Sequence, residues 1–463
     1  MLSFPLNILN LPLNGLLALL LLLARLRQAL IGAVLLLAAV PPLLLRPEPR
    51  RGAGERLAER LAQPDAQRWS SALLRAFAPN LRLPVRLRAY PCDSIVLVSR
   101  AEDVKEVLAR HESFAVVYGP RMEAVTGGQN FLLGMQDSPT YSRDLATMRL
   151  VFRREDGPVL LAPLAAAQAA ALVADCDGQL DLPQHLALPV ACAVVERYFG
   201  TPGPDRPRLI EWTSLLFWYI FVDLFADPVL ETRALAAARS LRAWLDQLIA
   251  QRKARPTPAD DVLNRCLAMQ GSAHPGLDDL AIRNNLIGFL VGGVAPLAQA
   301  ACQMVDVLLD RPEALAIAHR AAREGDDQLL DGCLFEALRF APGDPLIYRR
   351  ALETTTIAAG SLRACRVPKG AMVMALNGTA MFDPAAVHRP GAFRPDRPWQ
   401  EYLHWGYGLH SCAGAYLNRA VLPALLKPLL AQPGLGRAEG RRGRIDRADT
   451  PFVSHLQLVF ARD

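Results

Sequence analysis

The residues best placed to do chemistry lie in one short run, 404–419, which reads HWGYGLHSCAGAYLNR. This run places a single thiol, Cys412, among two histidines and three glycines. A thiolate that ligates a metal needs backbone amides turned towards its sulfur, because these amides hold its charge and tune the metal's potential. Glycine adopts the φ values of such a turn at little steric cost. The run therefore predicts a cysteine presented as a metal ligand.

The elements around this cysteine are expected to position it. Gly406 and Gly408 precede the sulfur, Gly414 follows it, and all three suit the turn. An apolar helix pattern begins near Ala413, so the positive end of a helix is expected to lower the pKa of the thiol. Because Ala413 and Gly414 are small, a flat macrocycle could lie against the chain at this point.

The amino-acid composition, net charge and cysteine spacing exclude several classes of protein function. The chain has 463 residues, of which 52% are hydrophobic and 21% charged, which provides material for a large core and excludes disorder. The net charge is +6, but no RNA- or DNA-binding motif is visible, so nucleic acid is not an expected partner. Eight cysteines occur without a CxxC pair. This spacing favours neither a disulfide scaffold nor a zinc site and indicates a reducing compartment.

The N-terminal segment differs from the rest. Runs 8–24 and 29–45 are almost wholly apolar, and each is close to the roughly 17 residues that can span a bilayer. Residues 1–51 are therefore interpreted as a membrane-anchor-like segment with a Pro/Arg hinge, and residues 52–463 as a catalytic domain on the cytoplasmic side. Three alternatives remain open: a start codon placed too early, a helix lying on a cytoplasmic catalytic domain, and a signal peptide.

Hydrophobic periodicity predicts a mainly α domain with a minor β region. Strand-like patterns appear at 85–98 and 346–374, and the run 380–412 has no helix pattern. Helices are expected at 55–78 with a break at Pro64, 101–110, 139–154, 158–175, 184–200, 207–226, 229–252, 277–309, 312–323, 328–340 and 413–431. The helix-free run is too long for an ordinary connection, and such loops are usually functional.

The cysteine run resembles the haem-binding loop of the cytochrome P450 family, F-x-x-G-x-x-x-C-x-G. It matches at Gly408, Cys412 and Gly414. Trp405 stands where the family has phenylalanine. The resemblance implies a haem b cofactor with the Cys412 thiolate as axial iron ligand, and His410 beside a haem propionate.

Other segments support this resemblance in the right order along the chain. Glu336-Ala-Leu-Arg339 resembles the ExxR pair that braces the cysteine loop, although the spacing alone also fits a surface pair. Arg349 matches a strand arginine that holds a propionate, with Arg350 as an alternative. Arg149 fits the place of a third propionate partner. The run from Phe393 to Arg397 is similar to the family's F-x-P-D-R, and the whole resemblance, from residue 60 onwards, implies one large helical domain.

The resemblance to the cytochrome P450 family fails in one segment, residues 292–296. Gly292-Gly293 occupies the small-residue step of the family's distal helix, but Ala295 and Pro296 stand where the family has an acid and an alcohol. Splitting O2 requires protons, and neither side chain can donate one. Pro296 still removes a helical hydrogen bond and is expected to kink the helix.

Two kinds of reaction are compatible with the absence of an acid and an alcohol at positions 295 and 296. The first is oxygen insertion into an apolar substrate by a monooxygenase, with electrons from a ferredoxin or reductase and protons from water or substrate. The second is a peroxygenase or a fatty-acid hydroperoxide-rearranging enzyme, in which Gln299 orients the peroxide; otherwise Gln299 is a bonded core amide. A non-catalytic haem sensor and a non-haem membrane-associated structural protein complete the alternatives.

The substrate is indicated only by polarity. The aromatic run 212–225, beside an N-terminal anchor, suits a lipid-like molecule, although helix core is the alternative for this run. Arg121 lies in the segment 118–135, which is expected to cover the haem pocket as a loop. An acidic headgroup on such a substrate could pair with it.

Overall fold

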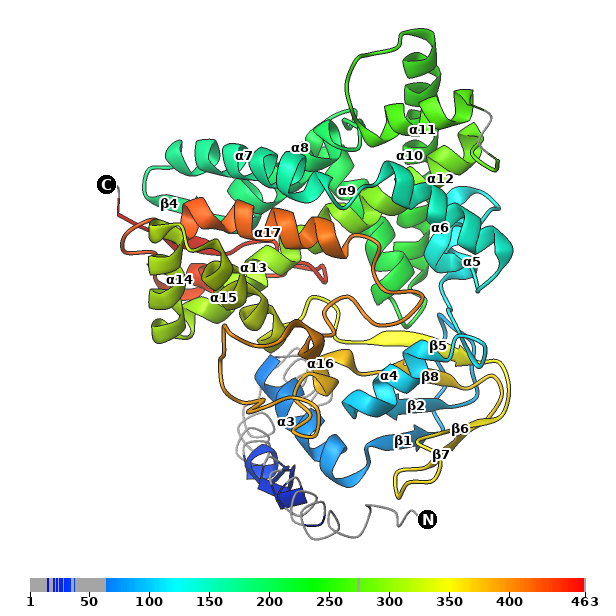
Figure 1. Cartoon of the computed structure of the whole chain (residues 1–463), viewed down its shortest axis with the longest axis vertical. Helices are drawn as coiled ribbons and strands as arrows, with labels where there is room; N and C mark the ends of the chain where they lie inside the picture. The colour runs from blue at the N-terminus through cyan, green and yellow to red at the C-terminus, as the bar shows by residue number, and fades with distance from the viewer. Residues whose placement is uncertain are drawn as a thin grey trace, which may run out of the picture.

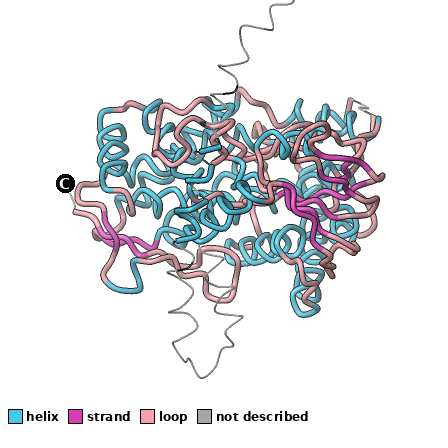
Figure 2. The backbone as a smooth tube through the Cα atoms, turned by 90° about the horizontal axis from the view of Figure 1, so that it is seen from below, coloured by secondary structure: helices cyan, strands magenta, loops and turns pink. Residues whose placement is uncertain are grey.

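The computed structural model describes residues 64–272 and 275–461, and the helical residues 15, 20, 22–23, 25–27, 29–34 and 37 of the N-terminal segment. The apolar runs expected at 8–24 and 29–45 therefore lie partly outside the described residues. Helices make up most of the described chain and strands a small part (Figure 2). The expected mainly α fold with a minor β region is confirmed.

The principal sheet has five strands in the order β1-β2-β8-β5-β3 and lies at one end of the molecule (Figure 1). Their bounds are Asn80–Leu83 (β1), Ile95–Val98 (β2), Phe114–Ala115 (β3), Ile347–Ala351 (β5) and Met372–Ala375 (β8). Strand β8 is buried along its whole length, because it pairs with β2 on one side and with β5 on the other. Its central position fixes the strand β5, which carries Arg349.

Two smaller sheets complete the β structure. One joins β4 (Gln179–Asp181), β10 (Gln457–Val459) and β9 (Gly436–Arg437), and the other joins β6 (Thr355–Ile357) and β7 (Cys365–Val367). The first ties the C-terminal segment to the centre of the chain, since Leu458 of β10 lies opposite Leu180 of β4.

Helices form the larger part of the molecule (Figure 1). Those before the centre of the chain are α3 (Pro64–Phe77), α4 (Ala101–Ala109), α5 (Gly119–Thr126), α6 (Pro139–Val151), α7 (Ala162–Ala174), α8 (Leu188–Arg197), α9 (Arg206–Phe217) and α10 (Pro228–Ala254). The later ones are α11 (Val262–Gly271), α12 (Asp279–Gly293), α13 (Ala295–Leu309), α14 (Pro312–Glu324), α15 (Asp327–Phe340), α16 (Asn377–Ala380) and α17 (Ala415–Leu430). Helix α17 packs along α7 and also contacts α13 and α15.

The long pattern 277–309 forms two helices rather than one. Helix α12 ends at Gly293, Val294 has φ −99° and ψ −78°, and α13 begins at Ala295. Pro296 lies in the first turn of α13, where a missing N–H costs nothing because no intrahelical acceptor is available there. The expected interruption is present, and it is a complete break at Val294.

Other expectations need correction. Helices α5 and α11 have no counterpart in the sequence-based prediction, and the segment 118–135 is not simply a loop. The strand pair expected at 85–98 lies at 80–83 and 95–98, because Pro84 and Pro91 interrupt the alternating pattern. The run from Met381 to Gly414 contains no α-helix, as expected.

Two helical segments among the described residues have the length and apolarity of membrane spans, 157–174 and 279–309. The second covers α12 and α13 and is mostly buried inside the domain. The first contacts α17 and α8. Only 28% of the first segment is buried, so the second alone is clearly a core helix pair of the domain.

Candidate functional site

The loop that carries Cys412 is a set of tight turns closed by its own backbone. The Cys412 N–H donates to the Trp405 carbonyl oxygen at 2.9 Å, and the Ser411 N–H donates to the Gly408 carbonyl oxygen at 3.2 Å. The Trp405 ring stacks on Trp399 with centroids 5.4 Å apart and meets Phe335 edge-on at 5.7 Å. The aromatic residue at 405 therefore anchors the start of the loop on α15.

Two of the three expected glycines supply the left-handed backbone. Gly406 has φ +78° and Gly408 has φ +75°. A Cβ on Gly408 would lie 2.7 Å from the Leu108 carbonyl oxygen, so no other residue fits this approach to α4. Gly414 differs, because its φ is −86°. A Cβ there would lie 3.8 Å from the Cys412 sulfur, an ordinary contact distance, so the backbone geometry does not require glycine at 414.

The Cys412 side chain is solvent-accessible although it lies deep in the protein. Burial raises the pKa of its thiol, and a hydrogen bond from the Gly414 backbone only partly offsets this effect. The lowered thiol pKa expected from the start of α17 is therefore wrong. Desolvation at this sulfur outweighs the Gly414 backbone hydrogen bond, and a bound cation would favour the thiolate.

A group of cationic and aromatic side chains converges beside the loop. The Tyr141 hydroxyl donates to the Leu409 carbonyl oxygen at 3.1 Å, and its ring lies 4.9 Å from that of His410. Arg349 is 2% exposed, and its one side-chain hydrogen bond within the described residues runs from Nη1 to the adjacent Tyr348 carbonyl oxygen. Burial, followed by the nearby charge of Arg349, lowers the pKa of His410 to about 4. Arg349 and His410 therefore lie close together.

The remaining arginine candidates are placed differently. Arg149 is exposed near the end of α6, close enough to Tyr141 to lower the pKa of that hydroxyl, which burial raises. Arg350 follows Arg349 on β5 and therefore points to the opposite face of the strand. Its Nη2 donates to the Pro91 carbonyl oxygen at 2.9 Å. Of the two alternatives on β5, Arg349 is the one beside the cysteine loop.

The break between α12 and α13 leaves room at the centre of the domain. Gly292 is solvent-accessible, and a Cβ added to it would meet nothing within 4 Å. Gly293 faces Val195 and Phe199 instead. Ala295 is buried and Pro296 is partly buried. Neither side chain carries an acid or an alcohol, so no proton donor stands at these two positions.

Gln299 is held by the C-terminal segment. Its Oε1 accepts a hydrogen bond from the Val453 N–H at 2.8 Å, and its side chain is buried. The alternative interpretation of this residue, a bonded core amide, is the one that the contact supports. Arg121 is likewise engaged, because its Nη2 pairs with Asp223 Oδ2 at 2.9 Å and its guanidinium lies 4.6 Å from the Tyr219 ring centroid. Arg121 is therefore already paired and is not available to bind an acidic headgroup.

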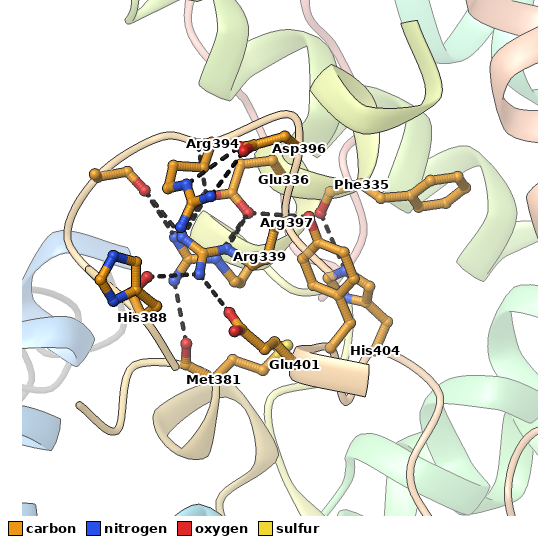
Figure 3. Close-up of polar contacts among 12 residues, drawn as sticks. Phe335, Glu336, Arg339, Met381, His388, Arg394, Asp396, Arg397, Glu401 and His404 are labelled. Carbon is orange, nitrogen blue, oxygen red and sulfur yellow. Dashed lines mark hydrogen bonds and ion pairs between the residues drawn. The ribbon is translucent and has the colours of Figure 1, made fainter. Parts of the chain in front are cut away.

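Glu336 is the centre of a buried polar cluster that fixes the long loop (Figure 3). Glu336 and Arg339 of α15 are both 0% exposed, and Arg339 Nη2 lies 2.7 Å from Glu336 Oε1. Arg397 binds the same carboxylate, with its Nε 2.9 Å from Oε2. Burial alone would raise the pKa of Glu336, but the hydrogen bonds from both arginines lower it. The pair is therefore a core ion pair and not a surface one.

The same cluster contains residues that the sequence-based prediction missed. The Tyr402 hydroxyl donates to Glu336 Oε2 at 3.1 Å, and Glu401 Oε2 accepts from Arg397 Nη1 at 2.6 Å. Arg339 Nη1 donates to the Met381 carbonyl oxygen at 3.1 Å, and Nη2 to that of Ala392 at 3.2 Å. The signal for Arg397 was the F-x-P-D-R run, whereas nothing in the sequence marked Tyr402.

These residues fit a haem. His410 has a buried Nδ1 with no hydrogen-bond partner, and Arg349 is a buried guanidinium with no carboxylate partner among the described residues. Buried polar groups are normally satisfied, so both are expected to face a missing acceptor. An accessible thiol lies beside them, and open space lies next to Gly292. The described residues contain no group of three or more His, Cys, Asp or Glu side chains that could hold a metal ion.

Known proteins resemble this chain in sequence and fold. It is 29% identical to the mycinamicin IV hydroxylase/epoxidase of Micromonospora griseorubida over 356 residues, 73% of this chain and 82% of that protein. It is 29% identical to the nocardicin C N-oxygenase of Nocardia uniformis over 386 residues, 79% of this chain and 87% of that protein. The crystal structure of CYP109E1 from Bacillus megaterium with testosterone superposes with a TM-score of 0.71 at 20% identity, covering 84% of this chain and 97% of that one.

The family model described as cytochrome P450 matches residues 85–432, most of the chain. This range includes α12 and α13, the Glu336 cluster and the whole cysteine loop. The chain therefore belongs to the cytochrome P450 family, whose members bind haem through a cysteine thiolate, and it is a haem-thiolate oxidoreductase.

Proposed function

We propose that residues 52–463 form a monooxygenase domain in which Cys412 ligates the haem iron and Arg349, His410 and Arg149 hold the propionates. The observation that carries this assignment is the pair of groups beside the accessible thiol: the buried His410 Nδ1, which has no hydrogen-bond partner, and the buried Arg349 guanidinium, which has no carboxylate partner among the described residues. A propionate would satisfy both groups. Trp405, Gly408 and Gly414 shape the loop, and Glu336 with Arg339 braces it from α15.

When bound, haem activates O2 for insertion of one oxygen atom into a C–H or C=C bond. The balanced reaction consumes two electrons and two protons and releases one water, so an electron donor such as a ferredoxin or reductase is required. Relatives named for hydroxylation, epoxidation and N-oxygenation support this reaction type. The substrate is a small, largely apolar molecule, and a lipid-like one is compatible with the aromatic run 212–225.

The weak point of this site is its proton supply. Ala295 and Pro296 hold no proton, and the oxygen of Gln299 is engaged by Val453. Protons must therefore arrive through water or the substrate. We expect the native enzyme to be slow with O2 and a competent electron donor, and to release part of the reduced oxygen as hydrogen peroxide.

Restoring a proton relay is expected to correct this defect. The double substitution Ala295→Glu with Pro296→Thr should raise O2-dependent turnover and the ratio of product to electrons consumed, because each proton-transfer group typically contributes about 10²–10⁴-fold. Product, peroxide and consumed electron donor are measured together. The control is Ala300→Glu on the same helix, which introduces a carboxyl one turn further on.

The competing peroxide chemistry gives the opposite result. If hydrogen peroxide or a fatty-acid hydroperoxide is the natural oxidant, native turnover with it should exceed O2-driven turnover, and the double substitution should weaken it. Fast, tightly coupled native turnover with O2 would instead show that water or substrate already supplies the protons. A haem-loaded protein with no turnover under either condition would support the sensor alternative.

The described part of the N-terminal helix packs on the catalytic domain. Ala29 is 1% exposed, Arg25 Nε lies 4.0 Å from Asp383 Oδ1, and a Cβ on Gly32 would lie 2.8 Å from the Trp69 carbonyl oxygen. The outer face exposes apolar side chains at 20, 22, 23, 26, 30, 31, 34 and 37. We infer that this helix lies along the domain and presents its outer face to a membrane surface, instead of crossing the membrane.

This membrane association is expected to depend on the exposed leucines. The full chain should float with vesicles of phosphatidylcholine and phosphatidylglycerol, and Leu30→Glu with Leu37→Glu should reduce the bound fraction at least about tenfold. Leu352→Glu with Leu362→Glu is the control, because these exposed leucines lie in the catalytic domain. Equal binding of both double variants would contradict a membrane role for the helix.

A further inference from the structure

Two tryptophan rings form a stack that starts on the cysteine loop. The Trp405 and Trp399 ring centroids are 5.4 Å apart, and the planes of the two rings are inclined by 29°. Trp405 belongs to the loop itself, because its carbonyl oxygen accepts the Cys412 N–H at 2.9 Å. The stack therefore begins at a residue whose backbone is bonded to that of the proposed iron ligand.

The outer ring of this stack reaches the protein surface. Trp399 is 37% exposed and lies in the short helical turn Trp399–Glu401. Phe335 of α15 meets its ring edge-on with centroids 5.3 Å apart, and Tyr402 does so at 5.4 Å. The Trp399 ring is thus held in place by three neighbouring rings and still contacts solvent. A molecule outside the protein can touch it there.

Other oxidisable rings near the cysteine do not form such a route. Tyr416 of α17 packs on Phe152 with centroids 4.9 Å apart, and Phe152 packs on Tyr198 at 5.8 Å. Tyr198 is 3% exposed, so this row of rings ends inside the protein. Tyr407 lies on the cysteine loop and is 43% exposed, but it is not part of the tryptophan stack, and its ring faces Lys105 Nζ at 5.7 Å. The tryptophan stack, by contrast, joins the loop to solvent.

A cation lies against the exposed indole. The Arg419 guanidinium, on an exposed residue of α17, lies 4.1 Å from the Trp399 ring centroid. The electron-rich face of a neutral indole attracts a cation. The same cation repels a ring that has lost an electron. Arg419 therefore makes Trp399 harder to oxidise, and its removal should make oxidation of Trp399 easier.

The identity of the residue at 405 decides whether the stack can carry electrons. Trp405 stands where the cytochrome P450 family has phenylalanine. A phenylalanine ring could fill the same place, but it is far harder to oxidise than an indole. The native enzyme is also expected to release hydrogen peroxide, because Ala295 and Pro296 hold no proton. An oxidisable route from the loop to the surface would allow this peroxide to be reduced.

We propose that Trp405 and Trp399 pass electrons from a donor at the protein surface to the haem site, which gives the chain a peroxidase activity towards donors too large to enter its interior. This inference rests on the proposed haem site. Hydrogen peroxide is the oxidant, and two electrons and two protons convert it to two molecules of water. Two phenol groups of the donor each lose one electron and one proton and become phenoxyl radicals. Trp399 is the residue that the donor contacts.

The test uses a donor that cannot enter the protein, tyramine coupled to dextran. Hydrogen peroxide is added to the haem-loaded full chain, and coupling of the phenoxyl radicals is followed by dityrosine fluorescence. Trp399→Phe keeps an aromatic ring in the stack but should lower this rate on the order of tenfold. Peroxide-driven conversion of thioanisole to its sulfoxide should stay unchanged in Trp399→Phe, because this small apolar molecule can enter the interior.

Two further variants separate electron transfer from a structural role. Tyr407→Phe is the matched control, because it removes an exposed oxidisable ring from the same loop outside the stack, and it should leave the rate with the tethered phenol unchanged. Arg419→Gln should raise that rate about two- to fivefold, the effect expected from loss of an exposed cation–π contact. Structural damage at either position would instead lower phenol oxidation and sulfoxide formation together.

A second readout does not depend on turnover. Peroxide added without a donor should leave oxygen-added and ring-opened products of tryptophan at position 399, which mass spectrometry of the digested chain locates. The tethered phenol should suppress these products, because it returns electrons to Trp399. Trp405→Phe, compared at equal haem content, should also reduce them, because it interrupts the route.

Several results would contradict the proposal. Equal oxidation of the tethered phenol by the native chain and Trp399→Phe would overturn it, as would oxidation products at Tyr407 in place of Trp399. A native chain that forms the sulfoxide but does not oxidise the tethered phenol would also overturn it and would leave the proposed function intact. A native chain that binds no haem, or lacks the thiolate carbon monoxide band, would contradict the proposed function itself.

Discussion

Cys412→Ala is expected to abolish the long-wavelength absorption band of the reduced carbon monoxide complex. This band requires a thiolate ligand to the iron, and Cys412 is the thiol that lies beside the buried Arg349 guanidinium and the unpaired His410 Nδ1. Cys412→His should bind haem through imidazole and give a band at shorter wavelength. Haem content, measured after denaturation, separates loss of the ligand from loss of the cofactor.

The matched control is Cys365→Ser. Cys365 is a free, partly exposed thiol on β7, in the small two-stranded sheet with β6. Its substitution should leave the spectrum and haem content unchanged. A normal long-wavelength band in Cys412→Ala would mean that another residue ligates the iron, and the assignment of the whole loop would fail.

The cysteine loop shows what motif spacing can predict. Glycine at 406 and 408 followed from the need for left-handed backbone, and both positions have positive φ. The pKa of the thiol did not follow, because a helix start is visible in a sequence whereas desolvation depends on everything packed around the sulfur. The choice between Arg349 and Arg350 likewise required the strand, since alternate faces cannot be assigned until its register is known.

Long-range polar contacts were the hardest to foresee. Glu336 and Arg339 are three residues apart on one helix, so their pairing could be predicted. Arg397 approaches the same carboxylate from 61 residues away. No local sequence pattern predicts a contact between residues so far apart along the chain.

Helix α5 was missed for a different reason. Helix α5 begins Gly-Pro-Arg and carries little apolar periodicity, so its helical state depends on its contacts with α10. Arg242 of α10 donates a hydrogen bond to the Val125 carbonyl oxygen, and Arg283 Nη2 donates to that of Thr126 at 2.8 Å. Tertiary contacts at its C-terminal end thus compensate for a weak intrinsic preference.

Glu336→Ala is expected to prevent folding or haem retention, and not merely to alter specificity. The substitution leaves Arg339 and Arg397 without their shared carboxylate in a site where the Glu336 and Arg339 side chains are fully buried. Breaking a buried ion pair in this way costs on the order of 3–5 kcal/mol of unfolding free energy. Soluble yield, haem content and the urea midpoint are measured. The pKa of Glu336 is lowered by folding, so its contribution should be fully present above pH 4.5, its ordinary pKa, and be lost as pH falls through the lowered value.

The control is Glu401→Gln, which removes a second carboxylate from Arg397 and leaves Glu336 in place. Because the Glu401 side chain is 14% exposed and Arg397 retains Glu336, the loss of stability should be clearly smaller. Glu336→Gln should fall between the two, since its amide oxygen can still accept a hydrogen bond while the charge is lost. If Glu336→Ala gave a soluble, haem-loaded enzyme of native stability, the long loop would be held by contacts other than this cluster. Arg339 would then contribute through its bonds to the Met381 and Ala392 carbonyl oxygens, and Arg397 through Glu401 and the His388 carbonyl oxygen.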